Sequence, residues 1–270
     1  MLQVSNLYKR FGPVQAVSGA SFHVQAKEAF GLLGPNGAGK STTISMITGL
    51  LRPDAGEVSV CGERMAVNAH RTKQHLGYVP QEVALYPDLT ARENLLFWGR
   101  LYGLSGARLQ ARVASVLELV GLSERAGQRV ATYSGGMKRR INIAAALLHE
   151  PELLVMDEPT VGIDAQSRSH ILNTVKELNR QGLTIVYTSH YMEEVELLCD
   201  RVAIMDQGSI IATGTVAELR NIVGEESQIT MTLQNWQADL AELLLALPIV
   251  SRVVTHGNEL VVASSNPSLA

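Results

Sequence analysis

Residues 34–41 could bind phosphate. They read Gly-Pro-Asn-Gly-Ala-Gly-Lys-Ser and match the pattern G-x-x-x-x-G-K-[ST]. Glycines let backbone N–H groups turn toward phosphate oxygens, and a helix that begins at the loop favours negative charge at its N-terminus. In such a loop Lys40 reaches the β- and γ-phosphates and Ser41 offers its hydroxyl to Mg²⁺. The pattern predicts a nucleotide-binding loop, and the competing interpretation is a glycine-rich structural turn.

Two carboxylates follow an apolar run at residues 153–156. An acidic residue at such a strand end, here Asp157, can hold Mg²⁺, usually through water. The next residue, Glu158, can orient and deprotonate an attacking water. A solvated acidic turn is the commoner explanation for Asp-Glu alone, but the phosphate loop upstream favours the catalytic interpretation.

Ser134, Gly135 and Gly136 form a second candidate anion site. Serine followed by glycines at a helix start points backbone N–H groups and the positive end of the helix dipole at a ligand. An ordinary helix N-cap is the alternative. If both helix starts bind phosphate, one nucleotide touches both, either within a chain or across a dimer.

The elements that would position these residues alternate between strands and helices. Apolar patterning predicts strands at residues 2–7, 20–24, 29–33, 153–156 and 184–188, and a hairpin over 202–212. Helices are expected at 40–48, 134–149 and 166–180, with a mainly helical insert over about 82–123. This order predicts an α/β sheet with an inserted helical piece.

The apolar pattern changes from about residue 225 to the last residue, 270. This segment predicts a β-α-β-β unit, with Leu240, Leu243, Leu244 and Leu247 on one helix face and a turn at His256-Gly257-Asn258. A two-layer module of this kind usually needs a further helix, so we expect the unit to be truncated or completed by another chain.

Composition excludes several classes of protein. Hydrophobic residues make up 46% of the chain and the net charge is -3, which excludes intrinsic disorder and a global electrostatic footprint for nucleic acid. Two distant cysteines, Cys61 and Cys199, exclude a disulfide framework. No signal peptide and no apolar run approaching about 18 residues is visible. We therefore expect a soluble chain that acts at a membrane only through a partner.

Taken together, the motifs resemble the nucleotide-binding subunit of an ABC transporter. Glycine loop, Ser-Gly-Gly and Asp-Glu occur in that family's order and spacing, and the likeness covers roughly residues 1–219. Residues 133–140 and 157–164 are similar to the branch that exports drugs and antibiotics. The resemblance implies a P-loop NTPase core with a mainly parallel sheet, an antiparallel β subdomain, a helical insert and a small α+β C-terminal appendage.

The resemblance also implies domain limits. The ATPase domain would span residues 1–220, with a RecA-like core at 1–81 and 150–220 and a helical subdomain at about 82–149. The small extension would span 225–270, as a unit that is truncated or completed by another chain.

Site roles follow from the resemblance, position by position. Phe11, rather than Tyr8, would stack on adenine, and Asp164 would face the partner subunit. Glu158 would be the general base, His190 would contact the γ-phosphate, and Gln81 would sense Mg²⁺, which Ser41 and Asp157 would also hold. The loop residues implied in nucleotide binding are Gly34, Pro35, Asn36, Gly37, Ala38, Gly39, Lys40, Ser41 and Thr42.

A head-to-tail dimer is implied as well, because Ser134, Gly135 and Gly136 would contact ATP on the opposite chain. This chain departs from the family pattern at Tyr133, where Leu is usual, and at Met137, where Gln is usual. Both changes affect affinity more than function, since the backbone supplies the donors.

The function implied is ATP binding and hydrolysis that closes and reopens a homodimer or pseudo-symmetric dimer. This cycle would drive export of a drug or other hydrophobic compound by a separate integral membrane permease, at the cytoplasmic face of the membrane and without nucleic acid. The helical insert and Gln81 would form a groove for a cytoplasmic helix of the permease, with apolar candidates at residues 86–89. Two alternatives are an ABC ATPase that acts on ribosomes or DNA, and a regulatory subunit that hydrolyses little ATP.

Overall fold

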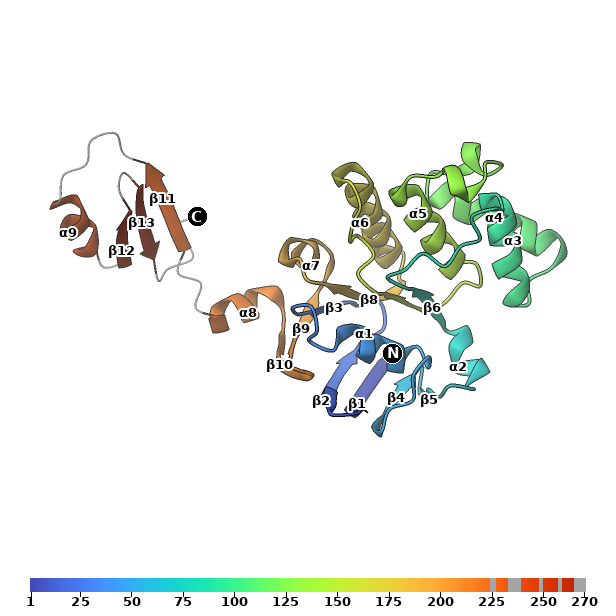
Figure 1. The fold of residues 1–270 in the computed structure, drawn as a ribbon, viewed down its shortest axis with the longest axis horizontal. Helices are drawn as coiled ribbons and strands as arrows, with labels where there is room; N and C mark the ends of the chain where they lie inside the picture. Colours follow the sequence, from blue (N-terminus) through green and yellow to red (C-terminus); the bar gives the residue numbers. More distant parts are fainter. Residues whose placement is uncertain (224–226, 233–238, 248–249, 257–258, 265–270) are drawn as a thin grey trace. The chain divides into compact units, whose positions relative to one another are not determined.

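The structure is a computed structural model that describes residues 1–223, 227–232, 239–247, 250–256 and 259–264 (Figure 1). The chain divides into two compact units, Met1–Thr215 and Val216–Ala270. No helix among the described residues is both long and apolar enough to cross a bilayer.

A six-stranded sheet in the order β10-β9-β3-β8-β7-β6 forms the centre of the first unit. The strands β3 (Ala29–Leu33), β6 (Leu76–Val79), β7 (Leu153–Met156), β8 (Thr184–Ser189) and β9 (Arg201–Asp206) run parallel, and β10 (Ser209–Gly214) pairs antiparallel with β9. Every residue of β7 and β8 is buried, as expected for strands covered on both faces. Loops that follow the parallel strands therefore meet at one edge, where α/β sheets bind ligands.

A second, antiparallel sheet in the order β2-β1-β4-β5 lies beside α1 (Lys40–Ile47). Its strands are β1 (Leu2–Phe11), β2 (Val14–Val24), β4 (Ala55–Val60) and β5 (Glu63–Arg64). One apolar cluster joins both sheets to α1, and within it the rings of Phe22 and Phe30 stack 5.2 Å apart. β1 and β2 extend beyond the strands predicted from apolar alternation, because their hairpin pairing continues through the polar residues to Phe11 and Val14.

The helical insert contains α3 (Ala91–Leu101), α4 (Gly106–Leu119) and α5 (Gly135–Ala146), with single 3₁₀ turns at Ser123–Arg125 and Val130–Thr132. Thr90 begins α3 with a capping box, in which its hydroxyl and the Glu93 carboxylate each bond the other's backbone N–H. Beyond the insert lie α6 (Ala165–Arg180) and α7 (Met192–Leu198), while α2 (His70–Gln74) precedes β6. The helices predicted at 40–48, 134–149 and 166–180 are confirmed, with ends that agree to within three residues.

The second unit has α8 (Val216–Val223) followed by β11 (Ser227–Thr232), α9 (Asp239–Leu245), β12 (Val250–His256) and β13 (Glu259–Ser264). Its three strands form an antiparallel sheet in the order β11-β13-β12. Leu260 and Val262 of β13 are buried, but Leu243 and Leu247 are 64% and 45% exposed, so the predicted apolar helix face is only partly covered. In the predicted turn, Gly257 and Asn258 lie outside the described residues.

Candidate functional site

The glycine-rich segment forms the connection between β3 and α1, with Gly39 as the N-cap of the helix. Gly37 and Gly39 have φ of 83° and 102°, in the left-handed region that favours glycine. A Cβ on Gly39 would also collide with the Ala16 carbonyl. The first turn of α1 carries no acidic residue, so its backbone N–H groups and dipole remain available for an anion.

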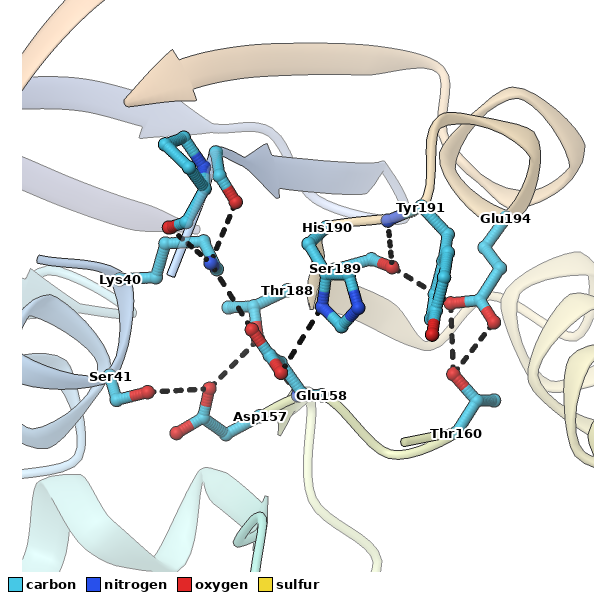
Figure 2. A network of polar contacts seen from close by, with 12 residues as sticks. Lys40, Ser41, Asp157, Glu158, Thr160, Thr188, Ser189, His190, Tyr191 and Glu194 are labelled. Atoms are coloured by element: carbon cyan, nitrogen blue, oxygen red, sulfur yellow. Dashed lines mark hydrogen bonds and ion pairs between the residues drawn. The ribbon is translucent and has the colours of Figure 1, made fainter. Parts of the chain in front are cut away.

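Lys40 brings one positive charge to this loop. Its side chain is 4% exposed, and Nζ donates hydrogen bonds to the carbonyls of Gly34 at 2.8 Å and Pro35 at 3.0 Å. The same ammonium forms an ion pair with Glu158 Oε1 at 3.1 Å (Figure 2). A buried charge needs partners of this kind, and phosphate oxygens offer the same chemistry as Oε1.

Asp157 lies just behind the loop. Its Oδ1 accepts hydrogen bonds from the Ser41 hydroxyl at 3.3 Å and the Thr188 hydroxyl at 2.8 Å (Figure 2). Burial raises the pKa of this carboxyl, against the opposing effect of those two hydroxyls. A cation beside Asp157 would favour its charged form. The donor set, a carboxylate and a hydroxyl at the end of a phosphate loop, is made of the hard oxygens that Mg²⁺ prefers, so these residues fit that ion.

Glu158 is held in an uncommon conformation next to Asp157. Its φ is +43°, and its backbone N–H donates to Thr188 Oγ1 at 2.8 Å. Its Oε2 lies 3.4 Å from His190 Nδ1, a contact without hydrogen-bond geometry. Left-handed backbone at a non-glycine residue persists where surrounding contacts over-determine it, often at active sites. Thr188, which sequence reasoning missed, provides those contacts for both acidic residues.

A cavity of about 650 Å³ collects half of the predicted site residues. Its lining includes six of the nine expected loop residues, the candidate base, the candidate switch histidine and the exposed Gln81. The structure thus brings together residues from four separate segments: Asn36, Gly37, Gly39, Lys40, Ser41, Thr42, Gln81, Glu158 and His190.

Other predicted site residues do not line this cavity within the described part of the chain. Phe11 is 50% exposed at the end of β1, and its cross-strand partner Val14 lines the cavity instead. Ser134 and Asp164 act as N-caps of α5 and α6, accepting from Met137 N at 3.2 Å and Ser167 N at 2.8 Å.

Gly34 lies too close to the Met205 carbonyl for any Cβ, and Gly136 lies equally close to the Ser167 side chain. Close backbone packing therefore accounts for these two glycines. Pro35 contributes its carbonyl to Lys40, Ala38 is buried, and Gly135 has open space around it.

Arg139 of α5 connects the helical insert to the loop of Gln81. Its guanidinium is 5% exposed and donates to the carbonyls of Pro80 at 2.6 Å and Gln81 at 2.5 Å. The sequence placed Arg139 in a predicted helix next to Ser-Gly-Gly, but helical periodicity gave no signal for this contact.

Glu194 of α7 forms a buried polar network around the same site (Figure 2). Its carboxylate accepts from the hydroxyls of Thr160 at 2.7 and 2.9 Å, Tyr187 at 2.9 Å and Ser189 at 2.9 Å. Burial, together with the nearby charge of Glu194, raises the pKa of Tyr187. Thr160 lies two residues after Glu158, and Ser189 precedes His190, so Glu194 connects the two segments that carry these side chains. An acidic residue four positions after His190 was the only sequence signal.

Comparisons with known proteins agree with this geometry. The ABC transporter family profile matches residues 17–161. The linearmycin resistance ATP-binding protein LnrL of Bacillus subtilis (strain 168) is 55% identical over 260 residues, which cover 96% of this chain and 84% of the relative. A Nod factor export ATP-binding protein I of Ralstonia nicotianae is 41% identical, over 99% and 82% of the two chains.

Solved structures give the same result. An ATP-binding subunit of an ABC transporter superposes with a TM-score of 0.75 and 33% identity, covering 83% of this chain and 93% of the other. A dimeric ATP-binding cassette in a post-hydrolysis state with ADP and Pi gives a TM-score of 0.72 and 25% identity, covering 80% and 99%.

Proposed function

The chain belongs to the ABC transporter family as an ATP-binding, ATP-hydrolysing subunit, and we propose that it drives export of a drug or other hydrophobic compound through a separate membrane protein. The names of two relatives, one in linearmycin resistance and one in Nod factor export, support the direction of transport. The observation that carries the proposed chemistry is the buried contact of Glu158 with both Lys40 and His190 at the phosphate loop.

In this proposal the triphosphate binds along residues 34–42, with the Lys40 ammonium and the first turn of α1 as counter-charges. Lys40 Nζ lies 3.1 Å from Glu158 Oε1, and phosphate oxygens compete with this carboxylate oxygen for the ammonium. The carboxylate oxygen so released takes a proton from the attacking water. His190, which lines the same cavity, contacts the terminal phosphate and stabilises its developing charge.

Ser41 and Asp157 would hold Mg²⁺, with Gln81, which lines the same cavity as Ser41, as a further oxygen ligand. The ion, when bound, neutralises negative charge on the transferred phosphoryl group. The 3.3 Å contact between the Ser41 hydroxyl and Asp157 Oδ1 supports this assignment, because both oxygens already converge on one point.

We further propose a head-to-tail dimer in which the N-terminal end of α5 meets ATP on the other chain. Ser134 and Gly135 lie outside the cavity of their own chain, and Gly135 has open space beside its Cα. Asp164, in the segment between Glu158 and α6, would face the partner chain, and Phe11 would stack on adenine. Dimeric cassettes among the related structures support this arrangement.

An apolar groove of about 480 Å³ is our candidate docking site for a cytoplasmic helix of the membrane partner. Leu50, Trp98 and Tyr102 line it, and Leu50 is 61% exposed. The indole Nε1 of Trp98 is buried without a hydrogen-bond partner among the described residues. The lining does not include residues 86–89, which the sequence had favoured; Tyr86 instead packs edge-on against Phe97 at 5.0 Å.

Glu158→Gln tests the chemistry. We expect kcat for ATP to fall about 100- to 10,000-fold, the usual contribution of a general base, with ATP still bound and a closed dimer accumulating. The matched control is Glu193→Gln, which removes an exposed carboxylate outside the cavity. Wild-type turnover in Glu158→Gln would refute the assignment of the base.

Affinity capture of the Glu158→Gln protein from detergent-solubilised membranes of the source cell, with MgATP present, tests the transporter role. A polytopic membrane protein in stoichiometric amount would support it and place the chain at the inner face of the membrane. Ribosomal proteins or nucleic acid without a membrane protein would favour the non-transport alternative and leave only the ATPase chemistry.

A further inference from the structure

Three metal-ligating side chains meet at the sheet edge opposite the nucleotide cavity. His75 and Glu152 lie immediately before β6 and β7, whereas Gln81, Asp157 and Glu158 follow the other ends of these strands. Cys61 lies in the turn between β4 and β5. One ligand atom from each of Cys61, His75 and Glu152 falls within 4.8 Å of the others.

The geometry is close to that of a coordination site. His75 Nδ1 lies 2.6 Å from Glu152 Oε1, and Cys61 Sγ lies 3.9 Å from Glu152 Oε2. With metal–ligand distances of about 2.0–2.3 Å, ligand atoms of a tetrahedral zinc site lie about 3.3–3.8 Å apart. Because the three ligand atoms lie within 4.8 Å of one another, shifts of about 1 Å in these exposed or partly exposed side chains would admit an ion.

The backbone holds the three residues in place. The His75 carbonyl accepts from the N–H groups of both Glu152 and Leu153 at 3.0 Å, and Cys61 N donates to the Met1 carbonyl at 2.7 Å. Cys61 also has a φ of +52° in a two-residue turn with Gly62, where asparagine or aspartate is usual. A cysteine in this conformation suggests that its side chain, and not the turn, determines the residue type.

We propose that Cys61, His75 and Glu152 bind one Zn²⁺ ion, which ties the antiparallel sheet to the start of β7. A thiolate, an imidazole and a carboxylate are the ligand types of zinc, and partial exposure leaves a fourth position for water. Mg²⁺ prefers oxygen ligands alone, so this site and the nucleotide site select different ions. On binding, the Cys61 thiol releases its proton to solvent and the sulfur–zinc bond forms.

Isothermal titration of Zn²⁺ into tag-free, EDTA-stripped full chain tests the proposal. We expect one ion per chain for the wild type. Cys61→Asn, a residue suited to the left-handed turn, should weaken binding by at least about tenfold, since even outer-shell changes at metal sites cost about 10- to 100-fold. Cys199→Ala is the matched control, because Cys199 packs against the core of the same unit and should leave the affinity unchanged.

His75→Ala should likewise weaken zinc binding, whereas His70→Ala, five residues earlier and exposed, should not. With Co²⁺ as a spectroscopic probe, the wild type should show a thiolate-to-metal charge-transfer band in the near ultraviolet that Cys61→Asn lacks. The proposal is overturned if the wild type binds no Zn²⁺, or if Cys61→Asn keeps wild-type zinc affinity or the cobalt band. It is also overturned if Cys199→Ala loses as much zinc affinity as Cys61→Asn. None of these measurements depends on ATP hydrolysis.

Discussion

The buried carboxylate of Glu194 gives the sharpest test of how the site is held together. It is 3% exposed, accepts hydrogen bonds from the hydroxyls of Thr160, Tyr187 and Ser189, and lies 3.6 Å from the guanidinium of Arg168. Glu194→Gln keeps the shape but removes the charge and replaces one acceptor oxygen with an amide N–H₂. With the glutamine oxygen at the Oε2 position, all three hydroxyls keep an acceptor, but that acceptor is neutral, and the amide N–H₂ replaces Oε1 beside the Thr160 hydroxyl.

The magnitude follows from the number of bonds. A hydrogen bond to a charged group contributes about 1.5–3 kcal/mol and one between neutral groups about 0.5–1.5 kcal/mol. Losing the charge at three bonds should lower the free energy of unfolding by about 2–4 kcal/mol. The exposed neighbour Glu193 provides the control, since Glu193→Gln should change stability by less than about 0.5 kcal/mol.

Urea unfolding of both variants measures this difference, and a double-mutant cycle with Thr160→Val isolates the pair. We expect a coupling energy between Glu194 and Thr160 of about 0.5–3 kcal/mol. Because the network adjoins Glu158 and His190, kcat should also fall, by up to about 100-fold if either side chain shifts by about 1 Å. Glu194→Gln within about 0.5 kcal/mol of wild type, with unchanged kcat, would refute the reasoning.

Three further predictions concern the loop, the insert and the groove. Gly37→Ala should destabilise the chain by about 1–2 kcal/mol through left-handed backbone strain. Gly39→Ala should cost more, because of these two glycines only Gly39 has a carbonyl where a Cβ would lie. Urea unfolding compares the two variants, and equal losses of stability would contradict the steric argument. Thr90→Ala should cost about 1 kcal/mol through the lost helix cap. Thr90 holds the pKa of Glu93 below its usual value. The difference in unfolding free energy between Thr90→Ala and wild type should therefore shrink as pH falls through that lowered pKa, and a pH-independent difference would exclude the capping box. Trp98→Ala should reduce recovery of the membrane partner in affinity capture while ATP affinity stays unchanged, and full recovery would exclude the groove.

Much of the fold could be predicted from local pattern. Each buried run at residues 29–33, 153–156 and 184–188 became a central strand, because continuous apolar runs of that length fit a sheet covered on both faces. Boundaries were less predictable. Apolar alternation ended before β1 did and began after β2 did, since cross-strand hydrogen bonds continue the hairpin through polar residues.

The candidate site likewise contains residues that local sequence predicts and residues that only long-range contacts bring in. Residues within one contiguous motif, such as Lys40 and Ser41, could be found because a loop and the helix after it are local structures. Thr188, Arg139 and Glu194 could not, because their partners lie 30 to 59 positions away or on other elements. Their residue types are common in any helix or strand, so nothing in the local sequence distinguishes them.

By itself, the sequence determined the phosphate loop, the acidic pair and the family, because each depends on residue types at fixed spacing. Only the tertiary structure decided that Lys40, Glu158 and His190 meet in one cavity, that Phe11 lies outside it, and that Cys61 approaches His75 and Glu152. The physical reason is strand order. β3, β8 and β7 are neighbours in the sheet although more than 100 residues separate β3 from β7 along the chain, and long-range pairing of this kind leaves no periodic trace in the sequence.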